Sequence, residues 1–375
     1  MSKELHIVCL DVPWPADYGG AIDMMNRIKA FHKAGVHVHL HYFSYNERGT
    51  PYELNAFCKT VHAYNRKSFK ESFNLKMPYI VASRINNELI ENLQKDDHPV
   101  LLEGLHTTGV LPHINTGNRK ICVRLHNDEV VYYKELAAST SNPVKKIYYR
   151  TESALIKKYI KTLSGNISYA CISHNDCEYM QQHGFKNVYH VPAFSNWQKV
   201  NCPDGVGNLC LFHGNLSVAE NEKAALWLLC NVFNKVRVPF IIAGKKPSRR
   251  LQKAAELCQH TCLVSDPTDQ ELDDLIQKAH INVLPFLNKH VTGIRLKLLH
   301  ALYKGRHCVV TPAMVDGTGL EAACHIGSNA NAIASIVSQL YYQPFNEEEI
   351  VLRKELLHHK YNNDQNILQF KELLW

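Results

Sequence analysis

A short stretch in the second half of the chain combines glycine, basic side chains and helical spacing in a way that could hold an anion. It reads VTGIRLKLLHALYKGR over residues 291–306, with Gly293 near its start and leucines recurring at helical spacing behind it. A helix beginning here would present unpaired backbone N–H groups and the positive end of its dipole. A nucleotide pyrophosphate suits that position, and Arg295 and Lys297 are long enough to add charge-assisted contacts.

The flanking residues predict that this helix lies between two strands. An apolar run, INVLP, occupies residues 281–285, and a β-branched run, HCVVT, occupies residues 307–311 before a proline. They predict a strand, a glycine-bearing turn, a helix that ends at Gly305 and a second strand. On spacing alone, a plain turn followed by a solvated helix face explains the glycine and the basic residues better than an anion site.

A pair of glycines near the start of the chain marks a second candidate loop. A strand-like run (HIVCL, residues 6–10) leads through a proline-rich loop to Gly19 and Gly20, and an amphipathic helix follows over residues 21–33. The full Gly-x-Gly-x-x-Gly fingerprint is missing, which disfavours a dinucleotide-dependent dehydrogenase. From the residues alone, a tight turn explains the pair as well as a phosphate contact does.

The strongest candidate for chemistry in the first half is the cluster that begins at His126. It reads His-Asn-Asp-Glu and directly follows the strand-like run KICVRL of residues 120–125. Side chains just past the carboxyl ends of parallel strands line the ligand crevice of open α/β sheets. His126 could bind a hydroxyl group or transfer a proton near neutral pH. Alternatively, Asn127 or Asp128 simply caps the helix that is expected from Val130.

Two loops of the second half also have the composition of phosphate loops. Gly214 and Asn215 follow the strand-like run of residues 208–213, and Lys245 and Lys246 follow an apolar run that ends in glycine. Glycine at a strand-to-helix turn exposes backbone amides, and lysines can pair with a pyrophosphate. A solvated loop is the alternative for the two lysines.

The order of elements predicts an α/β protein of two Rossmann-like domains. Roughly six strand–helix alternations precede a linker rich in proline and glycine, and four or five follow it. We expect a first domain over residues 1–196 and a second over residues 208–342. Residues 343–375 are expected to be helical.

Composition excludes several classes of protein. The chain has 375 residues, of which 45% are hydrophobic and 21% charged, and its apolar runs are far too short to span a bilayer. A net charge of +7 is modest, so we expect no nucleic-acid partner. The twelve cysteines lack paired spacing, and the 22 histidines form no His-Glu-x-x-His cluster. We therefore expect a reduced cytoplasmic location and no structural metal.

Contact with a membrane surface stays open at this stage. Residues 61–84 interleave lysine and arginine with tyrosine and phenylalanine, and residues 144–163 are rich in lysine. The first pattern suits a membrane surface or a stacked sugar, and the second a membrane surface. A solvated segment with aromatic side chains turned into the core explains the first slightly better, and a solvated basic helix face explains the second better.

The second half resembles the donor-binding segment of family 4 glycosyltransferases of the GT-B fold. The matching positions, some offset by one residue, are Gly293, Lys297, Leu299, Ala301, Gly305, Val309, Val310 and Thr311. Two departures stand out. His300 replaces the glutamate that usually holds the ribose of the sugar nucleotide, and Thr292 replaces the second glutamate, eight positions upstream.

The resemblance implies two Rossmann-like domains that face each other across a cleft, with a C-terminal helix that returns to the first domain. It also implies metal-independent, retaining transfer of a sugar from a nucleoside-diphosphate sugar to a glycan or lipid-linked acceptor, without a cofactor. His126 would lie near the anomeric carbon and act catalytically. The implied donor-binding residues are Gly19, Gly20, Gly214, Asn215, Lys245, Lys246, Gly293, Arg295, Lys297 and His300.

Two other functions are compatible with the sequence. His300 is as consistent with a non-catalytic protein of the same fold, which binds a glycan or a partner protein, as with an enzyme of altered donor preference. A sugar-nucleotide epimerase would need acidic residues near the sugar, for which Glu103, Asp128 and Glu129 are the candidates. We consider the epimerase the weakest of the three.

Overall fold

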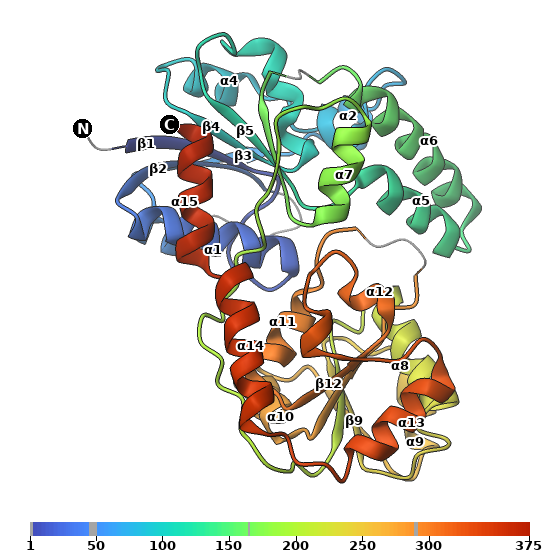
Figure 1. Cartoon of the computed structure of the whole chain (residues 1–375). Helices are drawn as coiled ribbons and strands as arrows, with labels where there is room; N and C mark the ends of the chain where they lie inside the picture. The colour runs from blue at the N-terminus through green and yellow to red at the C-terminus, as the bar shows by residue number, and fades with distance from the viewer. Residues whose placement is uncertain (1–2, 45–50, 164–165, 289–291) are drawn as a thin grey trace. The chain divides into compact units, whose positions relative to one another are not determined.

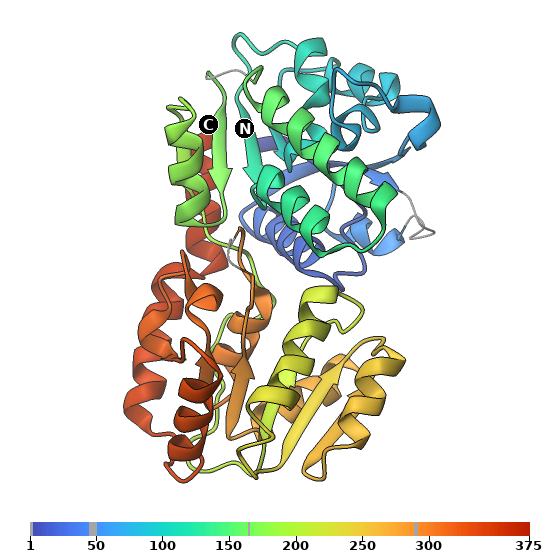
Figure 2. The ribbon, with the colours of Figure 1, turned by 90° about the vertical axis from the view of Figure 1, so that its right-hand side faces the viewer.

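The computed structural model describes residues 3–44, 51–163, 166–288 and 292–375, and it divides the chain into two compact units. The first unit comprises Met1–Asn196, Thr292–Ile294 and Tyr361–Trp375, and the second comprises Trp197–Val291 and Arg295–Lys360. Each unit is a parallel β-sheet with helices on both faces (Figures 1 and 2). The expected fold class is therefore confirmed.

The described residues of the first unit form a seven-stranded parallel sheet in the order β3-β2-β1-β4-β5-β6-β7. The strands are β1 (Lys3–Cys9), β2 (Val36–Ser44), β3 (Thr60–Asn65), β4 (Val100–Glu103), β5 (Ile121–Leu125), β6 (Ser168–Cys171) and β7 (Val188–His190). The helices are α1 (Gly19–Lys33), α2 (Phe69–Ser72), α3 (Tyr79–Ala82), α4 (Asn87–Leu93), α5 (Glu129–Ser139), α6 (Pro143–Ile160), α7 (His174–Gln182) and α15 (Asn363–Leu374), with 3-10 turns η1 (Tyr52–Ala56) and η2 (Leu105–His113).

The second unit has a smaller parallel sheet, six-stranded over its described residues, in the order β10-β9-β8-β11-β12-β13. Its strands are β8 (Cys210–His213), β9 (Phe240–Gly244), β10 (Thr261–Ser265), β11 (Ile281–Leu284), β12 (His307–Val310) and β13 (His325–Ile326). Its helices are α8 (Ala219–Asn231), α9 (Arg249–Glu256), α10 (Asp269–Lys278), α11 (Leu296–Lys304), α12 (Pro312–Val315), α13 (Ala330–Leu340) and α14 (Glu347–Lys360), with one 3-10 turn, η3 (Glu321–Ala323).

The sheets form where short β-branched and apolar runs can be buried on both faces, as parallel sheets require. In β1, the side chains of Leu5, Ile7 and Cys9 enter a core with α1 and α15, while Val8 enters the core on the other face. Strand order places β1 beside β4 and β8 beside β11, so in each unit the order reverses at the first strand. Ligands of open α/β sheets bind beside such a reversal.

The C-terminal tail differs from the single helical segment that we expected. It forms two helices: α14 belongs to the second unit, and α15 belongs to the first. The break falls at Asn362, whose side chain caps α15 by accepting from the amides of Asp364 and Gln365. Phe370 and Leu374 then enter the core beneath α1, so burial of apolar side chains returns the chain to the first unit.

One local prediction is also corrected. The helix that was expected to begin near Gly293 begins only at Leu296, with Arg295 as its N-cap residue. A short helix, α12, follows Thr311. Among the described helices, none has both the length and the apolar character needed to cross a membrane.

Candidate functional site

His126 lies in a cluster of buried charges at the carboxyl ends of β4 and β5. Its Nε2 atom is 2.9 Å from Oε2 of Glu103, and its Nδ1 atom is 3.5 Å from Oδ2 of Asp23 on α1. Arg27, one turn further along α1, donates to both acids, at 2.8 Å to Asp23 and 2.5 Å to Glu103. Arg124 of β5 contacts Asp23 at 3.4 Å. All of these groups except His126 are fully buried.

The two arginines keep both acids of this cluster charged. Burial opposes ionisation of Asp23, but Arg27 and Arg124 lower its pKa below the usual range. Arg27 and the hydrogen bond from His126 act in the same way on the pKa of Glu103. Ligand atoms of Asp23, Glu103 and His126 lie within 4.8 Å of one another, as they would around a metal ion. The arginines already balance the charge of both carboxylates, so the cluster does not fit a metal.

The arrangement suits an imidazole that is held in a fixed orientation. Each ring nitrogen of His126 faces a carboxylate, and its side chain is only 10% exposed. The helix-capping interpretation of the neighbouring residue is also confirmed, because Oδ1 of Asp128 accepts from the amides of Val130 and Val131. The sequence drew attention to His126 and to Glu103, but it predicted neither their contact nor the part of Asp23.

The candidate glycines of the first unit occupy two different environments. Gly19 and Gly20 are the first residues of α1. Backbone amides at this position have no hydrogen-bond acceptor within the helix. Gly293 has a φ of +65°, and a β-carbon at this position would lie 2.5 Å from the side-chain oxygen of Asn127. Its amide donates to Oδ2 of Asp176 at 3.2 Å. A donor-phosphate contact by Gly293 would have to replace that hydrogen bond.

Acidic groups line a small cavity beside Asn127. Burial raises the pKa of Asp176 to about 6, and burial together with Asp128 raises the pKa of Glu129 to about 8. The cavity has a volume of about 20 Å³, enough for one water molecule. Asp128 and Glu129 are two of the three acids named for an epimerase, whereas the third, Glu103, lies in the His126 cluster. A cavity of this size does not hold a sugar.

In the second unit, Lys297 joins two of the sequence-predicted segments. Its ammonium group donates to Oδ1 of Asn221 at 2.8 Å and lies 4.9 Å from the ring centroid of Phe212. The Asn221 amide in turn donates to the carbonyl of Asn215, at 2.9 Å, and packs against Gly214. Desolvation by burial lowers the pKa of Lys297 to about 8.

Arg295 and the lysine loop each contact a part of the segment that follows β8. The Arg295 guanidinium stacks on Phe286 at 4.2 Å, and its Nε atom is 3.7 Å from Glu220 at the start of α8. The carbonyl of Lys245 accepts from the Leu216 amide at 2.9 Å, which joins this loop to the Gly214 loop. The side chains of Lys245 and Lys246 are exposed. Gly244 permits this approach, because a β-carbon there would clash with the carbonyl of Gly214.

Two neighbouring side chains hold His300, the residue that was predicted to bind ribose. Its Nε2 atom is 2.5 Å from Asp273 on α10, and its ring stacks on Trp197 with centroids 4.2 Å apart. Only Nδ1 is left for a ligand. The ring of His213, at the end of β8, lies 5.7 Å away, and its buried Nε2 has no hydrogen-bond partner among the described residues. Neither Asp273 nor Trp197 was predicted from the sequence, which gives no spacing signal for them.

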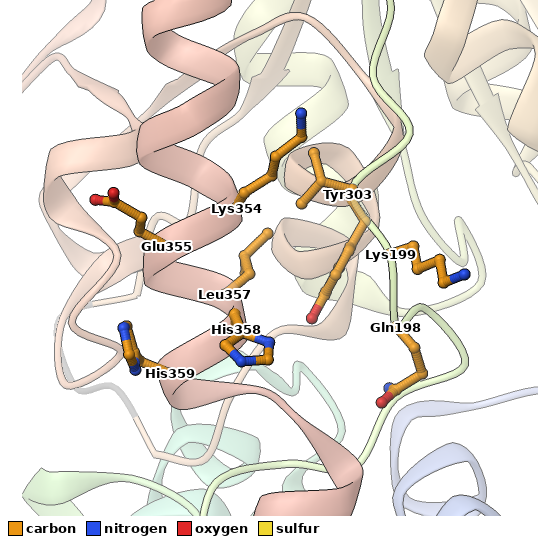
Figure 3. Close-up of a pocket in the computed structure, with 9 residues that line it drawn as sticks. Gln198, Lys199, Tyr303, Lys354, Glu355, Leu357, His358 and His359 are labelled. Carbon is orange, nitrogen blue, oxygen red and sulfur yellow. The ribbon is translucent and has the colours of Figure 1, made fainter.

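A larger hollow of about 510 Å³ lies on another side of the second unit, between α14 and the start of the unit. In Figure 3, Lys354 and His358 lie on the side of α14 that faces Tyr303, while Glu355 and His359 lie on the other side of α14. Its lining residues are Gln198, Lys199, Val200, Tyr303, Lys354, Glu355, Leu357, His358 and His359. None of them belongs to the site that the sequence predicts.

The basic and aromatic residues of the first unit divide between core and surface. Tyr64 is buried. The guanidinium group of Arg66 lies over the ring of Tyr79, 4.8 Å from its centroid. Phe69 on α2 and Phe73, the residue that follows α2, are exposed, and their ring centroids lie 4.6 Å apart. The expectation that the aromatic side chains point into the core therefore holds for only part of the segment.

Comparisons with known proteins agree with this architecture. Residues 207–343 match the family model described as glycosyl transferases group 1, so a domain of that family covers most of the second unit. The chain is 29% identical over 336 residues, 84% of each chain, to the "uncharacterized 44.6 kDa protein in cps region" of Klebsiella pneumoniae.

Two solved glycosyltransferases share the fold over their whole length. TarM superimposes with a TM-score of 0.70 at 12% identity, covering 100% of this chain and 99% of TarM. Sucrose-phosphate synthase from Thermosynechococcus elongatus also superimposes with a TM-score of 0.70, at 15% identity, covering 99% and 98%. At these identities the likeness shows the fold, which is that of GT-B glycosyltransferases. A mutant of TarM from S. aureus has been solved with fondaparinux, alpha-GlcNAc-glycerol and UDP.

Proposed function

We propose that this chain, with its glycosyl transferases group 1 domain, transfers a sugar from a nucleoside-diphosphate sugar to a glycan or lipid-linked acceptor, with retention of configuration. The observation that carries the proposal is the partly buried ammonium group of Lys297. Its hydrogen-bond partner is the neutral side chain of Asn221. Glu220 attracts this ammonium group electrostatically, and a diphosphate would supply a countercharge in direct contact.

The residues around Lys297 suit the diphosphate of a donor. Arg295 adds a second cation, and the Gly214 loop adds backbone amides at the carboxyl end of β8. Glu220 is the acid beside Arg295, and a bound diphosphate would compete with it for the guanidinium group. Donors fixed in advance around a leaving diphosphate stabilise the charge that grows on it in the transition state.

The proposed reaction follows the front-side route that the resemblance implies. The acceptor oxygen bonds to the anomeric carbon on the face from which the diphosphate departs, and the acceptor proton passes to the leaving phosphate. No covalent intermediate or cofactor is needed. His126, held between Glu103 and Asp23, would contact the transferred sugar or the incoming hydroxyl group.

A thermal-shift screen tests the donor site. UDP, GDP, ADP and their common sugar conjugates are added to the protein with and without Mg²⁺. We expect one nucleotide series to raise the melting temperature without Mg²⁺. Lys297→Ala should abolish the shift, and Lys253→Ala, an exposed lysine of α9, should preserve it. No shift with any nucleotide at millimolar concentration would contradict the proposal.

Hydrolysis of the donor that the screen identifies then tests His126. This assay needs no knowledge of the acceptor, because release of the nucleoside diphosphate is measured directly. We expect His126→Ala to lower the rate by about 10²–10⁴-fold and to leave the nucleotide-induced thermal shift unchanged. The exposed His113 provides the matched control, and His113→Ala should keep the full rate. An unchanged rate in His126→Ala would remove this residue from the reaction.

We also propose that the first unit contacts an anionic membrane surface, as a lipid-linked acceptor would require. Helices α2 and α6 adjoin, with the rings of Phe69 and Tyr148 5.8 Å apart. Both segments expose apolar side chains beside lysines, as membrane-surface segments do. The exposed apolar residues are Phe69, Phe73, Leu75, Val144 and Ile147, and the exposed lysines among them are Lys70, Lys76 and Lys145.

Co-sedimentation with vesicles that contain anionic phospholipid tests this contact. The double variant Val144→Glu/Ile147→Glu should lower the bound fraction several-fold. Leu257→Glu changes an equally exposed apolar residue of the second unit and should leave binding unchanged. Equal binding of all three proteins, or no binding by the unaltered chain, would contradict the membrane contact.

One observation favours a second candidate function. Asp273 and Trp197 hold His300, which stands where relatives place the ribose-binding glutamate. A non-catalytic glycan- or partner-binding protein of the same fold would have no need of that ribose contact. The thermal-shift screen separates the two functions, because the second one predicts no stabilisation by nucleotides.

A further inference from the structure

A second histidine–carboxylate cluster lies in the second unit, at a different place from the candidate donor residues. His307 and His325 are the first residues of β12 and β13, and Glu349 lies in the first turn of α14. The strands of this sheet are parallel, so the cluster is at their amino ends. The candidate donor residues follow the carboxyl ends of β8, β9 and β11, at the opposite end of the same sheet.

Three ligand atoms converge at the separations that a tetrahedral ion requires. Nδ1 of His307 is 3.3 Å from Nε2 of His325 and 3.4 Å from Oε1 of Glu349. Nε2 of His325 is 3.7 Å from the same carboxylate oxygen. With metal–ligand bonds of roughly 2.0–2.2 Å, ligands of a tetrahedral zinc ion are about 3.4 Å apart. A metal ion placed between these three atoms would therefore lie at a normal metal–ligand distance from each of them.

Neighbouring backbone groups orient two of these ligands. Nε2 of His307 lies 3.1 Å from the carbonyl of Gln343, which can only accept, so this nitrogen carries the proton. Its Nδ1 atom then points a lone pair into the cluster. The other oxygen of Glu349 accepts from the Asn346 amide at 3.3 Å, while the Asn346 side chain accepts from the Glu349 amide at 3.0 Å. Hydrogen bonds of this kind fix the ligands of metal sites.

No cation of the protein takes the place of a metal here, within the described part of the chain. The ion-pair partners of Glu349 there are the two histidines. Arg353, the nearest arginine on α14, donates instead to the carbonyls of Gly305 and Arg306. The Asp23–Glu103–His126 cluster has the same three-group form, but Arg27 and Arg124 balance its charge.

We propose that His307, His325 and Glu349 bind one divalent transition-metal ion, zinc by preference. Two imidazoles and one carboxylate suit zinc and disfavour magnesium and calcium, which take oxygen ligands. The fourth position is open to water, because the side chains of His325 and Glu349 are 35% and 30% exposed. The ion would join the first turn of α14 to β12 and the edge strand β13. This structural site does not depend on the proposed function.

Titration of the chelator-stripped protein with Co²⁺ and then Zn²⁺ tests the site. We expect one Co²⁺ per chain, with the intense visible absorption of a four-coordinate ion, and its displacement by Zn²⁺. Zn²⁺ should bind with a Kd of about 1 μM or below and should raise the melting temperature. Elemental analysis of the protein as purified should show bound zinc.

Variants separate this site from other places where a metal could bind. His325→Ala and Glu349→Gln change partly exposed residues and should each abolish the Co²⁺ absorption. His359 and Glu348 on α14 are exposed and lie outside the cluster, so His359→Ala and Glu348→Gln should preserve it. Absorption that persists in the first two variants, or no saturable absorption at all, would overturn the proposal.

A specific competitor is the adjacent thiol pair. Cys308 and Cys324 follow and precede the two histidines in the sequence, and their thiols hydrogen-bond to each other. A thiolate-to-Co²⁺ charge-transfer band that Cys308→Ser removes would place the ion on the thiols and would also overturn the proposal. We expect no such band.

Discussion

The two histidine–carboxylate clusters differ in how their charge is balanced. In the first unit, Arg27 and Arg124 are fully buried with Asp23 and Glu103, so His126 sits in a cluster whose charges are matched within the fold. In the second unit, the Glu349 carboxylate faces two imidazoles and, over the described residues, no lysine or arginine. Similar sets of side chains therefore serve different purposes.

The comparison shows that charge balance distinguishes a positioning network from a binding site. A buried acid that is paired with arginine is already satisfied and can only orient its neighbours. Lys297 follows the pattern of the second cluster, because its ammonium group has a neutral amide as its hydrogen-bond partner. An unbalanced charge of this kind is stabilised by a ligand of opposite charge. The following experiments test the contrast, from the largest effect to the smallest.

Removing the shared cation of the first cluster should have the largest effect. In Arg27→Met, Asp23 and Glu103 would stay buried without their main partner, and we expect the free energy of unfolding to fall by about 3–5 kcal/mol. Urea titration measures the loss. Lys33→Met is the control, because Lys33 on the same helix forms an exposed ion pair with Asp364 and should have little effect. Equal losses of unfolding free energy in the two variants would show that the buried ion pairs stabilise the fold no more than the exposed one.

An acid of the first unit whose pKa is raised rather than lowered should behave in the opposite way. Burial, together with Asp128, outweighs the Asn127 hydrogen bond and the nearby Arg84 and raises the pKa of Glu129 to about 8. Protonated Glu129 contributes its full share to the free energy of unfolding below the pKa that it has in the unfolded chain. That contribution is lost as the pH rises toward 8. Glu129→Gln should therefore raise the free energy of unfolding at pH 8 by about 1–3 kcal/mol, and much less at pH 5.

Urea titrations at the two pH values measure this difference. Glu178→Gln, an exposed acid on α7, should show no change at either pH. A destabilised Glu129→Gln at pH 8 would mean that the charged carboxylate is needed in the first unit.

The charge of Lys297 should make nucleotide binding depend on pH. Its pKa of about 8 means that the ammonium form, which a diphosphate needs, declines as the pH rises through 8. We expect the affinity for the stabilising nucleotide to be about tenfold lower at pH 9 than at pH 7. Calorimetry at three pH values measures this, and Lys297→Arg should flatten the profile because arginine stays charged. A flat profile in the unaltered chain would separate Lys297 from the diphosphate.

The smallest effect is expected in the second cluster without metal. With a chelator present, Glu349→Gln should unfold within about 0.5 kcal/mol of the unaltered chain, because glutamine can still accept from the Asn346 amide. Adding Zn²⁺ should then stabilise only the unaltered chain. A loss of several kcal/mol in the chelated protein would show that the fold itself requires this carboxylate.

Much of the fold was predictable because its signals are local. The apolar runs that became β1, β5, β8, β11 and β12 are bounded by polar or turn residues, and amphipathic stretches separate them. The N-cap role of Asp128 was also predictable, because a capping side chain contacts amides only two or three residues away. The position of Gly293 before a helix was predictable, but not the start of that helix at Leu296.

The sequence by itself determined the two Rossmann-like sheets and brought His126, Lys297 and the Gly214 loop to attention. Only the tertiary structure decided which charges are balanced. Asp23, Glu103 and Arg124 come from distant parts of the chain, and so do His307, His325 and Glu349. Secondary structure follows from contacts between near neighbours, which leave a pattern in the sequence. The pairing of charges depends on which strand and helix ends meet in space, and no spacing in the sequence records it.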